Sequence, residues 1–199
     1  MHAQAHVVEA VRRGIATGEL LPGQRLVEAD LGEKLGASRG MVRGALMKLV
    51  HEGLLEQIPH SGVRVRAITE EEATQTAEAC LALQAMCVAK AARMAGEADV
   101  ERFHRIGVAL RQAVTSRNLT EFERAVGEFD DLVLRVSAQN VAGEIVGRLR
   151  VRIAHTERKA LLRGSALEAT ALRYEEMIEA IAGGDAERAS AALASLVAV

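Results

Sequence analysis

The stretch from Leu31 to Leu55 constrains the fold of this chain more than any other part of the sequence. It contains two short segments in which apolar residues recur at helical spacing, separated by a turn that includes Gly36 and Ser38. Gly36 readily adopts a positive φ and so ends the first helix, and Ser38 is a favoured N-cap for the second. The second helix begins with Arg39 and Arg43 on its leading turns. This pattern is typical of a helix-turn-helix that presents a cationic helix to the DNA major groove.

The composition excludes several other classes of protein. The chain of 199 residues is 49% hydrophobic and 26% charged, which is the composition of a globular protein with a core. Aromatic residues make up only 2%, and this favours close-packed helices. No apolar run approaches the roughly 18 residues of a membrane span, and the N-terminus has no apolar stretch of a signal peptide. We therefore expect a cytoplasmic protein without a membrane partner.

Charge is distributed unevenly along the chain, although the net charge is only −2. Residues 1–67 contain nine Lys and Arg and seven Asp and Glu, a net charge of +2. Residues 68–199 contain the other 16 Lys and Arg and the other 20 Asp and Glu, a net charge of −4. The asymmetry is modest, but its sign is that of a DNA-binding N-terminal part joined to an acidic regulatory part.

The two cysteines are not predicted to form a disulfide. Cys80 and Cys87 lie seven residues apart in a segment of helical pattern. On one helix this spacing corresponds to about 10.5 Å, which exceeds the roughly 7 Å between Cα atoms that a disulfide allows. We expect both to be small buried residues on one helix face.

Residues 1–67 are predicted to form a small domain of three helices and a β-hairpin. The expected helices cover residues 4–17, 27–35 and 39–51, and Pro22-Gly23 predicts a tight reversal between the first two. Residues 54–58 and 63–67 read as strands around a polar tip. In this position the hairpin would be the wing of a winged helix.

Residues 68–199 are predicted to be helical throughout, and no proline occurs in them. Thr69 and Glu72 form a capping-box pattern, and Thr120, Ser165 and Asp185 are the expected caps of later helices. The expected helices cover residues 70–95, 98–117, 121–137, 141–162, 166–182 and 186–198. The predicted fold is therefore mainly all-α: a winged helix-turn-helix over residues 1–67, followed by a six-helix antiparallel bundle over residues 68–199.

The run IATGELLPGQRLVEADLGEKLGASRGMVRGALMKLVHEGLLEQIPHSGVRVRAIT, about 55 residues long, resembles the N-terminal winged helix of GntR-type bacterial transcriptional regulators. The resemblance implies that Arg39 and Arg43 contact bases and phosphates of double-stranded DNA. It implies that Ser38 caps the recognition helix close to the DNA backbone. Met41, in the Gly40-Met41 pair that replaces the family's usual Thr-Pro, would lie at the same DNA surface.

The resemblance to GntR-type regulators also extends to residues of the hairpin. His60 and Gly62 match the wing tip, which in the family's fatty-acid regulator reaches the minor groove; His60 could equally be a polar tip residue. Arg64, like Arg66, is either a phosphate contact or part of the hairpin's solvent face. Gly44 stands where Glu is usual, so an arginine loses a carboxylate partner and the helix carries a flexible residue at a cost of about 1 kcal/mol relative to Ala.

Residues 70–198 resemble the all-helical effector domain called FCD (fatty-acid-regulator C-terminal domain), in its shorter, vanillate-regulator-like branch. Many FCD domains bind a divalent metal through Asp-x-x-x-His and two later histidines. The corresponding positions here are Gly127, Asp131, Tyr174 and Leu196. Because Zn²⁺ or Ni²⁺ needs three or four convergent donors, we expect a pocket without a metal or other cofactor.

The resemblance also implies a small-molecule effector, commonly a carboxylate. Arg148, Arg152 and His155 lie on nearly one face of their predicted helix, and this face either binds an anionic effector or faces solvent. Asp131 and Tyr174 complete the expected effector pocket. For Tyr174 we favour a ring that fills the vacated metal volume over a hydrogen bond to the effector.

These observations predict a homodimeric, ligand-responsive transcriptional regulator, a repressor, that binds a pseudo-palindromic operator. One alternative is a metal-assisted sensor. Another is a helical-bundle enzyme that uses the winged helix as an interaction module. We favour the regulator because the sequence contains no catalytic motif.

Overall fold

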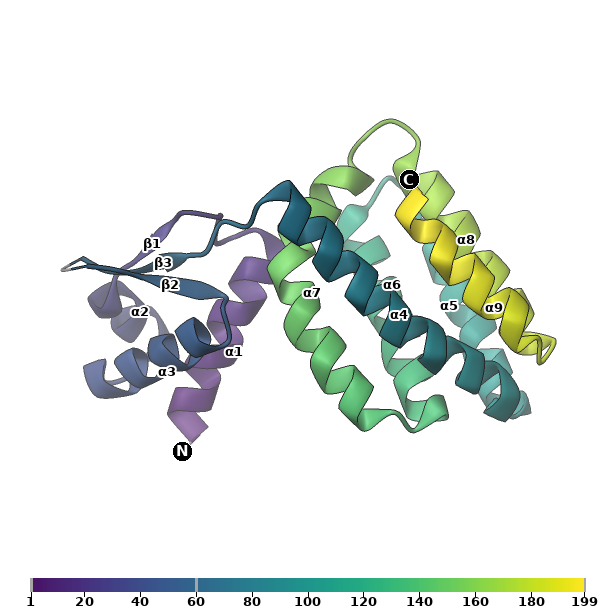
Figure 1. Ribbon diagram of the computed structural model, residues 1–199, viewed down its shortest axis with the longest axis horizontal. Coiled ribbons are helices and arrows are strands. Elements are labelled where there is room, and N and C mark those ends of the chain that lie inside the picture. The colour runs from purple at the N-terminus through teal and green to yellow at the C-terminus, as the bar shows by residue number, and fades with distance from the viewer. Residues whose placement is uncertain (1, 60, 199) are drawn as a thin grey trace. The chain divides into compact units, whose positions relative to one another are not determined.

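The chain forms two compact units, and the computed structural model describes residues 2–59 and 61–198, with side chains described for 4–59 and 61–196 (Figure 1). Unit 1 consists of Met1–Thr76 with Arg148–Arg158, and unit 2 consists of Ala77–Gly147 with Lys159–Val199. Each unit has its own hydrophobic core. The sequence predicted a single domain boundary between residues 67 and 68. In the structure, residues 148–158 also belong to unit 1, although they come much later in the chain.

Three helices of unit 1 pack around one apolar core. They are α1 (His2–Thr17), α2 (Glu28–Leu35) and α3 (Arg39–His51). Apolar residues at helical spacing on α1 and α3 are at most 6% exposed: Val7, Val8, Val11 and Ile15 on α1, and Val42, Ala45, Leu46 and Leu49 on α3. Val50, which the sequence pattern also placed on the stripe of α3, is only partly buried. Burial of this stripe leaves the opposite face of α3 in solvent.

The predicted hairpin is confirmed, and a third strand joins it. The strands are β1 (Arg25–Leu26), β2 (Leu55–Ile58) and β3 (Gly62–Val65), in the antiparallel order β1-β3-β2. Arg64 lies opposite Glu56 of β2 on one side and opposite Arg25 of β1 on the other. β1 was not predicted, because a segment of two residues is too short to show the alternation of apolar and polar residues that marks a strand.

The remaining helices agree with the predicted ranges to within about two residues at most ends. They are α4 (Glu70–Met94), α5 (Glu97–Thr115), α6 (Leu119–Ser137), α7 (Asn140–Leu161), α8 (Ala166–Ala182) and α9 (Ala186–Ala194). The last predicted helix instead ends as a 3₁₀ turn over Ser195–Ala198. Within the described residues, no helix is both long and apolar enough to cross a membrane.

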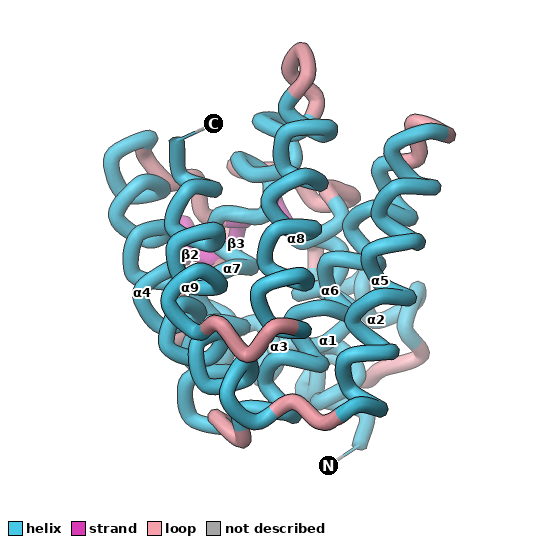
Figure 2. Tube along the Cα trace, turned by 90° about the vertical axis from the view of Figure 1, so that its right-hand side faces the viewer, coloured by secondary structure: helices cyan, strands magenta, loops and turns pink. Residues whose placement is uncertain are grey.

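In unit 2, α5 packs against α6 and α8, and α8 packs against α9 (Figure 2). The centre of the core is aromatic: the ring of Phe129 lies edge-on to Phe103 at 5.5 Å and to Tyr174 at 5.1 Å. Cys80 and Cys87 are both buried and both free thiols, as the spacing predicted.

The helix starts only partly follow the predicted caps. Asp185 accepts a hydrogen bond from the backbone N–H of Arg188 (2.9 Å), as expected. Ser165 precedes α8 but makes no capping hydrogen bond. The predicted cap at Thr120 is wrong, because Asn118 caps α6 by accepting from the N–H of Glu121 (3.2 Å). Both residue types favour the N-cap, and the helix extends back to the earlier one.

Candidate DNA-binding surface and effector pocket

The exposed face of α3 begins with a formed N-cap. Gly36 ends α2 with φ +61°, and the N–H of Met41 donates to Oγ of Ser38 (3.4 Å). Arg39, Gly40, Met41 and Arg43 are all exposed, and Met41 is 40% exposed. Within the described residues, Arg39 and Arg43 make no hydrogen bond or ion pair. Both guanidinium groups are therefore available to an external anion.

Arg12 contrasts with these free arginines because carboxylates balance its charge. Its guanidinium lies 2.5 Å from Oε2 of Glu52, just after α3, and 2.6 Å from Oε1 of Glu9. Burial alone would lower the pKa of Arg12, but the hydrogen bond and the charge of Glu52 outweigh it and raise the pKa. This ion pair ties α1 to the C-terminal end of the recognition helix.

The wing places Gly62 and Arg64 at its surface, while His60 lies outside the described residues. Gly62 is exposed with φ +90°, a conformation that favours glycine. Nε of Arg64 donates to Oε1 of Glu56 (2.7 Å), its neighbour across the strands. Arg66 forms a two-point ion pair with Glu72 (2.6 and 2.8 Å). Both wing arginines therefore already have carboxylate partners, unlike the two on α3.

Gly44 lies on the side of α3 next to α1, and the predicted loss of a carboxylate partner for an arginine stays a prediction. A Cβ built on Gly44 would lie 2.7 Å from Nε2 of Gln4, so this position faces α1. The Gln4 amide occupies the space that a longer side chain would need.

The five residues predicted for an effector pocket are not brought together in either described cavity. Tyr174 is 5% exposed and packs in the core, which agrees with the predicted filling role, whereas Asp131 is exposed on α6. Arg148, Arg152 and His155 belong to the segment of α7 within unit 1. α7 contributes its central part to unit 1, whereas Asp131 and Tyr174 belong to unit 2, so the shared effector pocket stays a prediction.

Arg152 and His155 line a cavity of about 20 Å³ together with Gly53 and Leu54. A cavity of this size holds about one water molecule and is too small for a metabolite. A Cβ built on Gly53 would meet the guanidinium of Arg152, which would have to move. The backbone favours glycine at position 53, because its φ is +72°.

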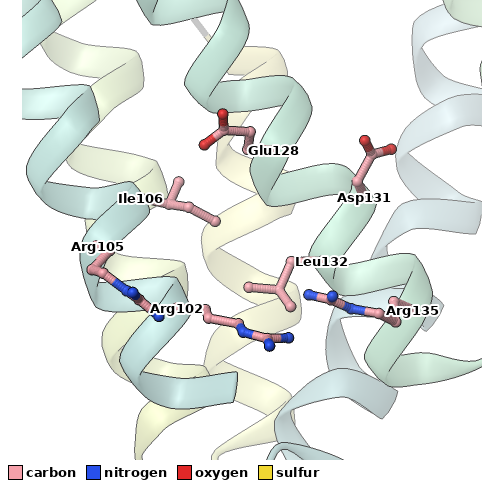
Figure 3. Close-up of a pocket in the computed structure, with 7 residues that line it drawn as sticks. All are labelled: Arg102, Arg105, Ile106, Glu128, Asp131, Leu132 and Arg135. Atoms are coloured by element: carbon pink, nitrogen blue, oxygen red, sulfur yellow. The ribbon is translucent and has the colours of Figure 1, made fainter. Parts of the chain in front are cut away.

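A larger, open groove of about 530 Å³ lies between α5 and α6 (Figure 3). We call it the α5–α6 groove, and it is lined by Arg102, Arg105, Ile106, Glu128, Asp131, Leu132 and Arg135. Of these, the sequence interpretation singled out only Asp131. The signal was present as arginines three apart on α5 and an acid and an arginine four apart on α6, but solvated helix faces commonly carry such pairs.

The positions that correspond to the family's metal ligands do not form a donor set. Gly127 has no donor side chain, Asp131 is exposed, and Tyr174 is buried against Phe129. In the part of the chain that the structure describes, no group of three or more His, Cys, Asp or Glu could hold a metal ion. Of these positions only Asp131 carries a carboxylate, and the metal-free pocket stays a prediction.

A winged helix with a capped, cationic helix, followed by an all-helical unit, defines a DNA-binding regulator with an effector domain. The chain belongs to the gntR family of bacterial regulatory proteins, whose family model matches residues 3–65. Its second part is an FCD domain, matched over residues 75–198. It is therefore a transcriptional regulator of this family, and the relatives that it matches are HTH-type regulators.

Curated relatives match over part of the chain, between 61 and 115 residues. The repressor MngR of the mannosyl-D-glycerate transport and metabolism system of Escherichia coli is 43% identical over 61 residues, 30% of this chain and 25% of its own. The regulator SmoD of Agrobacterium fabrum is 34% identical over 67 residues, 33% of this chain and 29% of its own. A regulator from Agrobacterium vitis is 26% identical over 115 residues, 58% of this chain and 64% of its own. Each match thus spans less than two thirds of the relative's length.

Solved structures share the fold over nearly the whole chain. Escherichia coli McbR/YncC superposes with a TM-score of 0.87 at 23% identity, covering 98% of this chain and 93% of that one. A GntR regulator from Rhodococcus sp. RHA1 gives a TM-score of 0.78 at 21% identity, covering 100% and 95%. At these identities the likeness concerns the fold alone.

Proposed function

We propose that the protein is a homodimeric repressor that binds a pseudo-palindromic operator with one α3 helix in each major-groove half-site. The observation that carries this proposal is the pair Arg39 and Arg43, which are exposed on a capped helix and whose side chains have no partner among the residues that the structure describes. An unpaired guanidinium can bind guanine edges or phosphates without first breaking an internal ion pair. The repressor MngR, 43% identical over 61 residues, supports the direction of regulation.

The contacts divide between the recognition helix and the wing. Arg39 and Arg43 bind base edges and phosphates, Met41 makes an apolar contact in the groove, and Ser38 lies beside the backbone. The wing tip, with His60 and Gly62, approaches the minor groove. Arg64 contributes a weaker phosphate contact, because binding DNA exchanges its existing ion pair with Glu56. Because its operator lies on the bacterial chromosome, the protein resides in the cytoplasm in this proposal.

The effector in this proposal is a small organic acid that binds the FCD domain without a metal. Two features support it: only Asp131 among the four metal-ligand positions carries a carboxylate, and α7 carries the cations Arg148, Arg150, Arg152 and Arg158. The effector acts by binding the DNA-competent and DNA-incompetent arrangements with different affinity. Tyr174 is a candidate for the apolar wall of this site, whereas Asp131 is exposed and lines the α5–α6 groove.

A footprint on the DNA upstream of the protein's own gene tests the proposal. We expect two protected half-sites related by two-fold symmetry, with centres about 10 base pairs or a multiple of one helical turn apart. Adding a panel of organic acids is expected to weaken protection with one of them, at unchanged metal content. A single asymmetric protected segment would contradict the dimeric arrangement. A stoichiometric transition metal in the purified protein would contradict the metal-free effector site.

A further inference from the structure

The α5–α6 groove has opposite charges at its two ends and an apolar floor. Its floor residues Ile106 and Leu132 are only 7% and 3% exposed. The guanidinium groups converge at one end and the carboxylates lie toward the other (Figure 3). The cationic end is formed by Arg102, Arg105 and Arg135, and the anionic end by Glu128 and Asp131.

Three of these charges have no partner within the described chain. Arg105, Arg135 and Asp131 make no hydrogen bond or ion pair there. Asp131 and Arg135 are four apart on α6, a spacing that permits an ion pair, yet their side chains point toward different ends of the groove (Figure 3). By contrast, Arg102 has Asp99 at 4.0 Å and Glu128 has Arg124. The groove thus presents two free cations and a free anion.

This arrangement suits a second copy of the chain better than DNA or a small molecule. Two carboxylates on the face would repel DNA phosphates. A small ligand usually has most of its surface buried, which an open groove of this kind does not provide. A two-fold rotation, however, places the cationic end of one copy on the anionic end of the other. A two-fold interface requires this self-complementarity.

We infer that the α5–α6 groove binds the same face of a second copy, with Asp131 of one copy opposite Arg135 of the other. The inference rests on the proposed homodimer and assigns its surface in unit 2. Two helices of 19 residues form the face. Each is about 28 Å long, and with axes about 10 Å apart they offer a surface of the order needed by a standard interface, roughly 800 Å² per partner.

Charge reversals test this pairing on the full-length protein by sedimentation equilibrium. Asp131→Arg and Arg135→Asp each place two like-charged pairs across the two-fold axis. We expect either variant alone to dimerise at least tenfold more weakly than wild type. In an equimolar mixture of the two variants both contacts again join opposite charges, so the heterodimer forms with near wild-type affinity. Glu78→Arg, an equal charge change at an exposed site on α4, serves as the control.

The outcomes separate this inference from the proposed function. Wild type that dimerises, with both variants within twofold of it, refutes the assigned surface and leaves the homodimer standing. Two weakened variants whose mixture does not recover refute the Asp131–Arg135 pairing. Wild type that stays monomeric at micromolar concentration refutes the proposed homodimer and the surface together. Recovery in the mixture also shows that both variants fold.

Discussion

Arg12 and Glu52 join α1 to the C-terminal end of the recognition helix, with Nη2 and Oε2 2.5 Å apart. The Glu52 side chain is only 15% exposed, so its charge is better shielded from water than that of a surface pair. We predict that Glu52→Gln lowers the free energy of unfolding by about 1–2 kcal/mol, because half-buried Arg12 loses its better carboxylate partner.

Glu9 supplies the matched control, because it binds the same guanidinium from a 63% exposed position on α1. Glu9→Gln is expected to change stability by less than about 0.5 kcal/mol, as exposed helix pairs do. Urea denaturation of both variants distinguishes the two roles. Equal effects would show that burial of the Arg12–Glu52 pair adds nothing to its strength.

Ser38 is predicted to have separable roles in folding and DNA binding. Ser38→Ala removes the oxygen that accepts from the N–H of Met41 and should cost about 1 kcal/mol of stability. Ser38→Asp keeps an N-cap acceptor and suits the helix dipole, so stability should remain within about 0.5 kcal/mol of wild type. Its carboxylate beside phosphate should nevertheless reduce DNA affinity tenfold or more, roughly the cost of one like-charge contact. Full DNA affinity in Ser38→Asp would place Ser38 away from the backbone.

The local signals around α3 predicted its structure well. The range 39–51, the cap at Ser38 and the left-handed Gly36 are all confirmed, because each depends on residues within one or two turns. Features that depend on distant residues were not predictable in this way. The two-residue strand β1 is defined only by its pairing with β3, and the orientation of Gly44 toward Gln4 depends on how α1 packs.

Two glycines on α3 are predicted to weaken it to different extents. A Cβ on Gly40 would meet nothing within 4 Å, so Gly40→Ala should stabilise the protein by about 0.5–1 kcal/mol. Gly44→Ala should gain less, because the Gln4 amide must move from 2.7 Å. In a Gln4→Ala background, Gly44→Ala should recover the full gain. Thermal unfolding of the four variants measures this; an equal gain from Gly44→Ala with and without Gln4 would contradict the contact.

Cys87 is predicted to make stability fall at alkaline pH. Burial raises the pKa of its thiol, and the opposing effects of Ser137 and Lys90 do not cancel this. Above the ordinary thiol pKa of about 8.5, the unfolded chain releases the proton while the folded chain keeps it. The unfolded state therefore binds fewer protons, and stability declines as pH rises, by up to about 1.4 kcal/mol per pH unit. Below that pH the effect vanishes.

Comparison with Cys87→Ala isolates this contribution, because the other titrating groups are common to both proteins. Between pH 8 and 10 the variant should lose stability less steeply than wild type. Parallel curves would contradict the raised pKa. The absolute stability of the variant does not affect the test, since only the slopes are compared.

The candidate site was predictable where one helix carries it and not where several elements do. Arg39 and Arg43 were identified from the turn that precedes them, and both are exposed. The effector residues were inferred from positions on α6, α7 and α8, and their placement depends on which unit each helix segment joins. The ion pairs of Arg64 and Arg66 likewise depend on strand register and on the start of α4.

The most direct test of the account is the Arg39→Ala/Arg43→Ala double variant, measured by fluorescence anisotropy on the footprinted operator and on a scrambled duplex. Wild type should prefer its operator by about a thousandfold or more. The double variant should lose this preference. The slope of its log binding constant against log salt concentration should become shallower by about 1–2. Arg93→Ala, an exposed arginine of α4, should change neither quantity. A double variant that still selects the operator would contradict the assignment of α3 as the DNA-reading helix.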